Sequence, residues 1–138
     1  RSSKEKSMPI LGICLGMQIL SNFGLENKKT NGLGLIDGSV ESIKSSPEKL
    51  PHLGWNSVKF LKAKNKLFSN IKNKKDYYFI HSYCFKCKNK ENVLATSDFN
   101  ENFASIINKD LIYGIQFHPE KSLRNGLKLI ENFLKIDE

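Results

Sequence analysis

A short apolar run near the N-terminus of the sequence leads straight into a turn framed by glycines. Residues 9–13 are apolar enough to form a strand that is buried on both faces, as in the parallel sheet of an α/β protein. A short helix is predicted to begin near Gly16, with apolar positions at Met17, Ile19, Leu20 and Phe23. The order of strand, sharp turn and helix favours folds in which helices pack on a sheet.

The turn places a cysteine where a nucleophile can be presented. Gly12-Ile13-Cys14-Leu15-Gly16 has the Gly-x-nucleophile-x-Gly form of a nucleophile elbow, with cysteine in place of serine. Strand and helix backbones nearly touch in such a turn, so both flanking glycines are expected to avoid a clash. We expect the helix N-terminus to favour the Cys14 thiolate and the Leu15 backbone N–H to stabilise an oxyanion. A buried structural cysteine between two packing glycines is the alternative.

The remaining chain reads as short strands followed by a helix. Strands are predicted at residues 39–43, 55–60, 77–82, 93–97, 103–107 and 112–117, and one helical turn at 66–71. Ser122 is expected to cap a final helix. One stripe of that helix is expected to pack on the sheet, formed by Leu123, Leu127, Ile130 and Leu134. The sequence thus predicts one α/β domain over residues 1–138, a mixed twisted sheet flanked by helices.

Charge and composition limit the expected partners and compartment. The chain has 22 Lys and Arg against 14 Asp and Glu, a net charge of +8, but only Arg1 and Arg124 are arginines. Because arginine reads phosphates and bases best and the lysines are scattered, a solvated surface is favoured over a nucleic-acid groove, with an acidic partner or anionic ligand as the other interpretation. With no membrane-length apolar run, no signal-like stretch and three cysteines, we expect a cytoplasmic protein with no membrane partner.

A histidine motif closes the last predicted strand. Gln116-Phe117-His118-Pro119-Glu120 puts His118 and Glu120 two residues apart, hence on one side of an extended segment, and Pro119 keeps His118 out of the helical region. A histidine oriented by a carboxylate, together with a cysteine elsewhere at the C-terminal edge of a sheet, is the arrangement of acyl-transfer catalysis. Taken alone the motif could be an ordinary strand-exit turn, but the two motifs together favour catalysis.

Two weaker patterns are not expected to bind a cofactor. Cys84-Phe85-Lys86-Cys87 has the spacing of a zinc or redox site, but the sequence has no second cysteine pair and the segment follows a strand rather than opening a helix. The spare imidazoles are His52 and His81. The glycines at 32, 34 and 38 lack the spacing of a phosphate loop and are expected in turns. We therefore expect neither a metal nor an organic cofactor.

The two motifs resemble the signatures of class I glutamine amidotransferases, which release ammonia from glutamine through a γ-glutamyl thioester. Residues 12–18 and 116–120 carry this resemblance. The segments 51–56 (Pro-His-Leu-Gly-Trp-Asn), 81–83 (His-Ser-Tyr) and 121–122 (Lys-Ser) are similar to one branch of that family, the glutaminase subunits of imidazole glycerol phosphate synthase in histidine biosynthesis. The resemblance covers residues 9–136 and implies the flavodoxin-like architecture of the family.

The resemblance also implies roles for individual residues. Cys14 would be the nucleophile, His118 the base and Glu120 its orienter, with Leu15 giving one oxyanion N–H. The residues that would line the pocket for L-glutamine are Gln18, His81, Ser82 and Tyr83. Those that would lie near the docked synthase subunit, a (βα)₈ barrel in a heterodimer, are Leu53, Trp55 and Asn56. A core position for Trp55 and a hydrogen-bonded position within the sheet for His81 are the alternatives.

The beginning of the sequence departs from the family pattern. Family members carry further strands before the nucleophile strand and a glycine-bearing loop that supplies a second oxyanion donor. We expect an N-terminally truncated chain, the C-terminal two thirds of a longer enzyme, whose isolated form has weak or absent glutaminase activity, because losing one such donor costs roughly 10²–10³ in rate. The strand at 9–13 would then leave an edge open to pairing.

Three other functions remain open from the sequence. The same glutaminase chemistry could feed a sugar-modifying amidotransferase. A subunit of the same fold could bind without catalysing. A basic nucleic-acid module is the third possibility.

Overall fold

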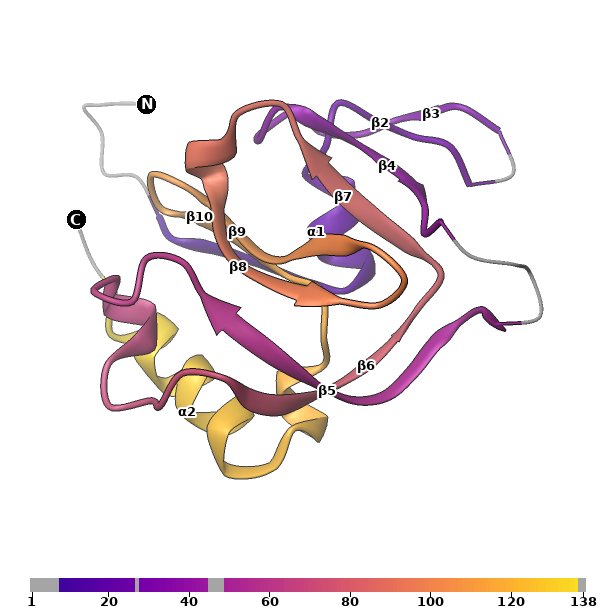
Figure 1. Cartoon of the computed structure of the whole chain (residues 1–138). Coiled ribbons are helices and arrows are strands. Elements are labelled where there is room, and N and C mark those ends of the chain that lie inside the picture. Colours follow the sequence, from indigo (N-terminus) through magenta and orange to yellow (C-terminus); the bar gives the residue numbers. More distant parts are fainter. Residues whose placement is uncertain (1–7, 27, 45–48, 137–138) are drawn as a thin grey trace.

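The computed structural model describes residues 8–26, 28–44 and 49–136, which form two mixed β-sheets and two α-helices (Figure 1). The charged segment 1–7 lies outside these residues. The six-stranded sheet contains, in spatial order, β1 (Ile10–Ile13), β10 (Ile112–Ile115), β9 (Asn102–Lys109), β8 (Val93–Asp98), β5 (His52–Phe60) and β6 (Lys75–His81). The four-stranded sheet contains β3 (Thr30–Asn31), β2 (Phe23–Gly24), β4 (Gly38–Ser42) and β7 (Tyr83–Cys87).

Each sheet contains one parallel strand pair. β1 runs parallel to β10 and β2 parallel to β4, and the other pairs are antiparallel. Ser82 alone separates β6 from β7, so the chain bends there and passes from one sheet to the other. This mixed α/β architecture confirms the predicted fold class, with a curled sheet and few helices.

The parallel pairing of β1 with β10 determines where the two sequence motifs lie. Ile13 is in register with Ile115, and the Cys14 N–H donates to the Ile115 carbonyl at 2.7 Å. Because parallel strands end at the same edge of a sheet, Cys14 and the segment that begins at Gln116 leave the sheet side by side. Among the described residues, β1 pairs with β10 alone and is therefore an edge strand.

The strand predictions were correct for the longer elements. Each of the seven predicted strands, including the one at residues 9–13, occurs with at least one shifted end, and the predicted helical turn is the 3₁₀ turn η2 (Lys66–Phe68). A second 3₁₀ turn, η3 (Lys90–Asn92), precedes β8. The helix expected to reach Phe23 is shorter, because α1 (Leu15–Ile19) ends where the chain turns into β2. The strands β2, β3 and β7 were not predicted from the sequence.

The C-terminal helix α2 (Leu123–Leu134) buries a different face from the one predicted. Leu123, Leu127 and Leu134 are 71%, 54% and 75% exposed, so the expected stripe was wrong. The buried face instead contains Gly126, Leu129 and Asn132.

Close approach and polar contacts explain this orientation. The Asn132 amide donates to the carbonyls of Leu67 and Ser69 at 2.8 and 2.9 Å. A Cβ at Gly126 would lie 1.9 Å from the carbonyl oxygen of Pro119 in the 3₁₀ turn η4 (Pro119–Lys121), so only glycine permits this packing.

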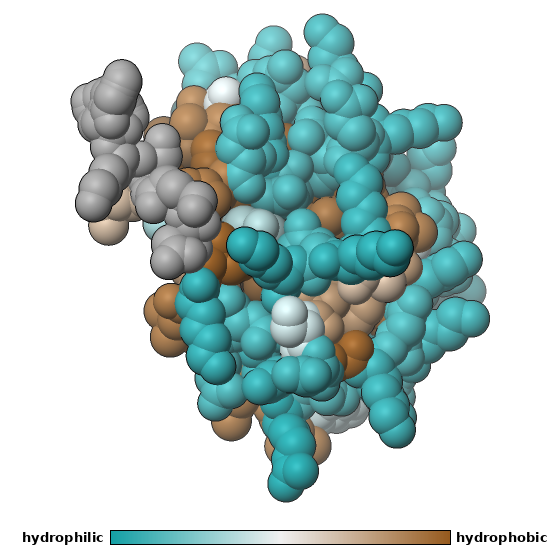
Figure 2. All heavy atoms as spheres, turned by 90° about the vertical axis from the view of Figure 1, so that its left-hand side faces the viewer, coloured by the Kyte–Doolittle hydropathy of each residue, from teal (hydrophilic) through white to brown (hydrophobic). Residues whose placement is uncertain are grey.

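Two apolar clusters stabilise the sheets. The larger one lies between the six-stranded sheet and α2, and it contains Phe79, Phe117 and Leu129. The smaller one joins α1 to the four-stranded sheet and to β9 through Met17, Phe85 and Ile107. On the face shown in Figure 2, hydrophilic residues dominate and hydrophobic ones form separate patches. No helix of the described residues is long and apolar enough to cross a bilayer.

Candidate active site

Cys14 occupies a sharp turn between β1 and α1. Its backbone has φ 56° and ψ −108°, a conformation that costs a non-glycine residue roughly 1–3 kcal/mol. A Cβ at Gly12 would lie 2.4 Å from the Gly16 carbonyl oxygen, which confirms that this flank must be glycine. The same prediction for Gly16 was wrong, because nothing lies within 4 Å of the position that its Cβ would take.

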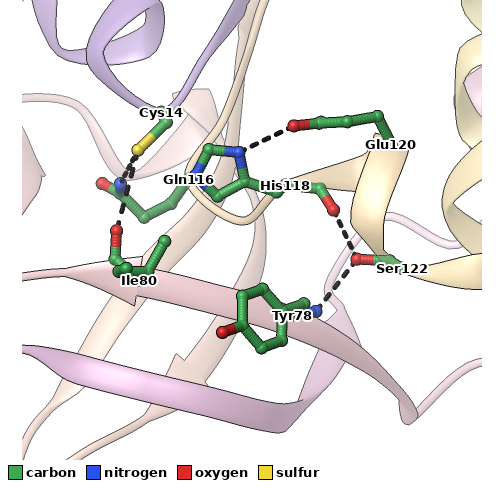
Figure 3. A network of polar contacts seen from close by, with 7 residues as sticks. All are labelled: Cys14, Tyr78, Ile80, Gln116, His118, Glu120 and Ser122. Atoms are coloured by element: carbon green, nitrogen blue, oxygen red, sulfur yellow. Dashed lines mark hydrogen bonds and ion pairs between the residues drawn. The ribbon is translucent and has the colours of Figure 1, made fainter.

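His118 is held in place by the neighbouring strand β6. Its backbone N–H donates to the Tyr78 carbonyl at 2.9 Å. The Ser122 hydroxyl donates to the His118 carbonyl at 2.6 Å and accepts from the Tyr78 N–H at 2.9 Å (Figure 3). Ser122 does precede α2 as predicted, but its hydroxyl makes no capping bond and instead links His118 to β6.

The His118 ring contacts the Glu120 carboxylate. Nδ1 of His118 lies 2.9 Å from Oε2 of Glu120 (Figure 3). His118 is extended as predicted, but Glu120 belongs to η4 rather than to an extended segment, so the turn brings its carboxylate to the ring. Since a carboxylate only accepts, Nδ1 carries the proton and Nε2 of the neutral ring can accept another. Burial alone would raise the pKa of Glu120, but the bond and charge of His118 hold that pKa below its usual value.

Cys14 and His118 line the same cavity, which has a volume of about 490 Å³. The four residues predicted to form the glutamine pocket line it too, namely Gln18, His81, Ser82 and Tyr83. Leu15, Ile13, Glu26 and Ile80 complete the lining. The structure therefore brings together residues that are more than a hundred positions apart. Glu120 is not part of the cavity lining and contacts the His118 ring from outside it.

Burial dominates the surroundings of the Cys14 sulfur. It raises the pKa of the thiol, and the nearby Glu120 charge raises it further, whereas hydrogen bonds from the Leu15 N–H and the Gln116 amide lower it. The thiol donates to the Ile80 carbonyl at 3.9 Å. The helix that follows Cys14 has only five residues, and burial outweighs the two hydrogen bonds that lower the pKa of the thiol. The expected contribution of the helix N-terminus to the thiolate stays a prediction.

His81 supports the cavity wall by hydrogen bonds. It is 6% exposed, its Nδ1 bonds to the Tyr83 carbonyl at 2.9 Å, and its Nε2 lies 3.0 Å from Nδ1 of His52. Burial lowers the pKa of both histidines to about 4, and the mutual proximity of the rings adds to this effect for His52. The alternative of a hydrogen-bonded histidine within the sheets therefore holds for His81. His81 also lines the cavity, and its expected role in binding glutamine stays a prediction.

Of the three residues expected at the partner face, two are exposed. Leu53 and Trp55 project from β5 and pair across strands with Ile80 and Tyr78 of β6. The core position considered for Trp55 is therefore excluded. Asn56 is only partly exposed, and its amide donates to the Asp98 carbonyl at 2.7 Å and contacts Nε2 of His52 at 3.2 Å.

The two remaining cysteines lie in β7. Cys84 packs in the larger apolar cluster and Cys87 against the smaller one. Burial raises the pKa of both thiols to about 11, so both are protonated near neutral pH. Within the described part of the chain, no group of three or more His, Cys, Asp or Glu side chains could hold a metal ion.

One family of known proteins matches nearly the whole chain. The family described as "Glutamine amidotransferase class-I" matches residues 1–136. The chain belongs to the class I glutamine amidotransferase family.

Two curated relatives are named as HisH subunits. The chain is 47% identical to "Imidazole glycerol phosphate synthase subunit HisH 2" of Methanococcus maripaludis, covering 95% of this chain and 64% of that protein. It is 46% identical to the HisH subunit of Pelagibacter ubique, covering 93% of this chain and 62% of that protein. The chain thus spans somewhat less than two thirds of these two relatives.

Solved structures support the fold. A putative GMP synthase protein of Thermoplasma acidophilum is 23% identical with a TM-score of 0.65, over 91% of this chain and 55% of that one. A glutamine amidotransferase of Thermotoga maritima is 24% identical with a TM-score of 0.62, over 91% of this chain and 46% of that one.

Proposed function

We propose that this chain is the glutaminase part of an imidazole glycerol phosphate synthase, hydrolysing L-glutamine to glutamate and ammonia. The observation that carries the proposal is one cavity lined by both Cys14 and His118, at the ends of the parallel strands β1 and β10. Relatives named as HisH subunits support the choice of branch within the family.

The proposed reaction begins with a proton transfer. Nε2 of His118 takes the Cys14 thiol proton, and the sulfur attacks the side-chain amide carbon of glutamine. The Leu15 N–H, which already bonds to the Cys14 sulfur, is placed to stabilise the oxyanion. His118 then gives its proton to the departing ammonia, which leaves a γ-glutamyl thioester on Cys14.

Hydrolysis of the thioester completes the reaction. His118 removes a proton from water, whose oxygen attacks the thioester carbon. The carbon–sulfur bond breaks, glutamate leaves, and the proton returns to the sulfur. Glu120 holds the ring with Nδ1 protonated and stabilises its charged form through the 2.9 Å contact. The remaining cavity residues, Gln18, His81, Ser82 and Tyr83, would bind or position glutamine.

The partner is proposed to be the synthase subunit, a (βα)₈ barrel in a cytoplasmic heterodimer, which uses the ammonia in histidine biosynthesis. Leu53, Trp55 and Ile80 form an exposed apolar patch, and Ile80 also lines the Cys14 cavity. Such a patch beside a reactive site fits a docked subunit better than open solvent. We include Asn56 in the proposed interface region, with its amide already bonded internally. Residues 1–138 are proposed to form one domain.

A glutaminase assay tests this proposal. The natural full-length chain is mixed with glutamine in the presence and absence of its synthase subunit, and glutamate and ammonia are measured. We expect glutamate formation that rises with the synthase subunit and disappears in Cys14→Ala. Equal rates for Cys14→Ala and the unmodified chain would contradict the proposal, whereas activity without any response to the synthase would contradict only the proposed partner.

A further inference from the structure

A buried amide links the nucleophile to the wall of the cavity. Gln116 is fully buried and follows β10 directly. Its Nε2 donates to the Cys14 sulfur at 3.8 Å (Figure 3), and its Oε1 accepts from Nε2 of Gln18 at 3.2 Å. Its backbone N–H donates to the Ser105 carbonyl at 2.9 Å. Both ends of the side-chain amide are therefore used within the protein.

One backbone carbonyl determines which atoms of the two side-chain amides donate and which accept. Gln18 also contacts the Tyr83 carbonyl at 3.1 Å, and because a carbonyl can only accept, the Gln18 atom there must be its NH₂ group. The same NH₂ group then needs an acceptor on Gln116, which must be the amide oxygen. The Gln116 NH₂ group is thereby turned toward the sulfur of Cys14. No alternative orientation of either amide satisfies all three contacts.

Few other groups favour a negative sulfur at this position. Burial and the Glu120 carboxylate both oppose the thiolate, and the Leu15 N–H favours it. The other titratable groups that line the cavity are Glu26 before β3, His81 and Tyr83 at the β6–β7 bend, and His118 after β10. A neutral donor fixed at the sulfur offsets part of the burial without adding a charge that would compete with His118.

We propose that Gln116 is a further functional residue of this site, whose amide N–H stabilises the Cys14 thiolate formed when His118 takes the proton. The proposal deepens the glutaminase function and rests on it for the reaction step. The N–H contact to the sulfur is a property of the folded chain and can be tested without turnover. Gln116 also fixes Gln18, so its amide connects the nucleophile to the cavity wall.

The experiment measures the pH dependence of Cys14 alkylation in the natural full-length chain. Iodoacetamide reacts with thiolates, and mass spectrometry of the Cys14 peptide separates this site from Cys84 and Cys87. Gln116→Met removes the amide at nearly constant shape. Asn132→Leu is the matched control, since it also replaces a buried amide by an apolar side chain but lies on α2 against η2.

We expect the alkylation midpoint of Gln116→Met to rise by about one pH unit, because a hydrogen bond to a charged group is lost. Alkylation below the midpoint should slow about tenfold. The midpoint of Asn132→Leu should not move. An unchanged midpoint in folded Gln116→Met would overturn the proposal.

A second variant keeps the test possible if Gln116→Met does not fold. Gln116→Glu keeps the shape and the acceptor for Gln18, and above the pKa of its carboxyl it has no donor for the sulfur. We expect its midpoint to rise at least as far as that of Gln116→Met, and an unchanged midpoint there would also overturn the proposal. If the unmodified chain with its synthase shows no glutaminase activity, the proposed function fails, while the alkylation midpoints still decide the role of Gln116.

Discussion

The three histidines of this chain lie in two regions that use the same side chain differently. His118 follows β10 at the cavity and contacts a carboxylate, with a fifth of its side chain exposed. His52 and His81 are 3% and 6% exposed and bond to each other, to the Tyr83 carbonyl and to the Asn56 amide. Burial and uncharged partners keep the second region neutral, whereas a carboxylate orients the ring of the first region.

The tautomers of the buried pair follow from its contacts. The Tyr83 carbonyl can only accept, so Nδ1 of His81 carries a proton and its Nε2 accepts from Nδ1–H of His52. Nε2 of His52 then accepts from the Asn56 amide, whose NH₂ group also donates to the Asp98 carbonyl. Two neutral rings satisfy every bond of this network, and an added proton has no acceptor within it. We therefore predict that His118 is the reactive histidine and that His52 and His81 have a structural role.

The largest expected effect is on glutaminase activity, and it should differ between His118 and the buried histidine pair. His118→Asn should reduce glutaminase turnover by about 10³-fold or more, because the proposed general base is lost. His81→Asn should act mainly on folding stability and on the glutamine KM, with a smaller change in kcat. Steady-state kinetics of the natural full-length chain with its synthase measure both. Equal kcat losses in the two variants would contradict the distinction between a reactive His118 and a structural His81.

The pH dependence of stability tests the buried pair next. The native pKa of about 4 for His52 and His81 lies below the ordinary value of 6.5, so between these pH values the unfolded chain binds more protons than the native one. The free energy of unfolding should therefore fall as pH is lowered from 6.5 to 4, by at most about 3 kcal/mol for each histidine. Denaturant titrations across this range measure the slope.

A non-titrating variant provides the control for that slope. In His52→Asn/His81→Gln the buried imidazoles are absent, so the decline between pH 6.5 and 4 should flatten even if the variant is less stable throughout. The same slope in both proteins would show that the pair is not the source of the acid sensitivity.

Replacing Glu120 should affect turnover less than replacing His118. Glu120→Gln should reduce turnover by roughly 10- to 100-fold, because the ring loses the carboxylate that holds Nδ1 protonated and stabilises its charged form. The loss should be smaller than for His118→Asn, since the side chain of Glu120 is 48% exposed and water screens its charge. A pH–rate profile, with Glu131→Gln on α2 as the control, checks this. A loss as large in Glu131→Gln would contradict the assignment.

The smallest expected effect concerns the end of the buried network. Asn56→Ala removes the donor to Nε2 of His52 and the bond to the Asp98 carbonyl, which should lower the free energy of unfolding by about 1–2 kcal/mol. Ser57 offers a control, because its side chain is exposed and Ser57→Ala should change the stability by less than about 0.5 kcal/mol. Thermal unfolding measures both. Equal effects would show that the Asn56 amide does not stabilise the pair.

The sequence predicted the parts of this site that depend on local chemistry. A cysteine in a tight strand-to-helix turn and a histidine beside a carboxylate are both visible in a few consecutive residues. Their meeting depends on the parallel pairing of β1 with β10, which was not predicted because no pattern within either strand indicates its partner. No role was predicted for Gln116, because nothing in its neighbours along the chain indicates that its amide faces a sulfur.

The errors have equally local causes. Hydropathy selected the leucine stripe of α2, but the contacts of Gly126 and Asn132 turn the opposite face inward. The strand β7 was missed because no turn residue other than Ser82 separates it from β6, and the change of sheet at that position has no compositional signal. Strand alternation alone could not decide whether Trp55 is buried, since it depends on which face of β5 meets the core.

Covalent trapping tests the central claim most directly. The natural full-length chain with its synthase is treated with a glutamine analogue that carries an electrophilic ketone at the side-chain end, and intact and peptide masses are recorded. We expect one adduct, on Cys14, that forms far more slowly in His118→Asn. An adduct confined to Cys84 or Cys87, or a Cys14 adduct that forms at the same rate without His118, would contradict it.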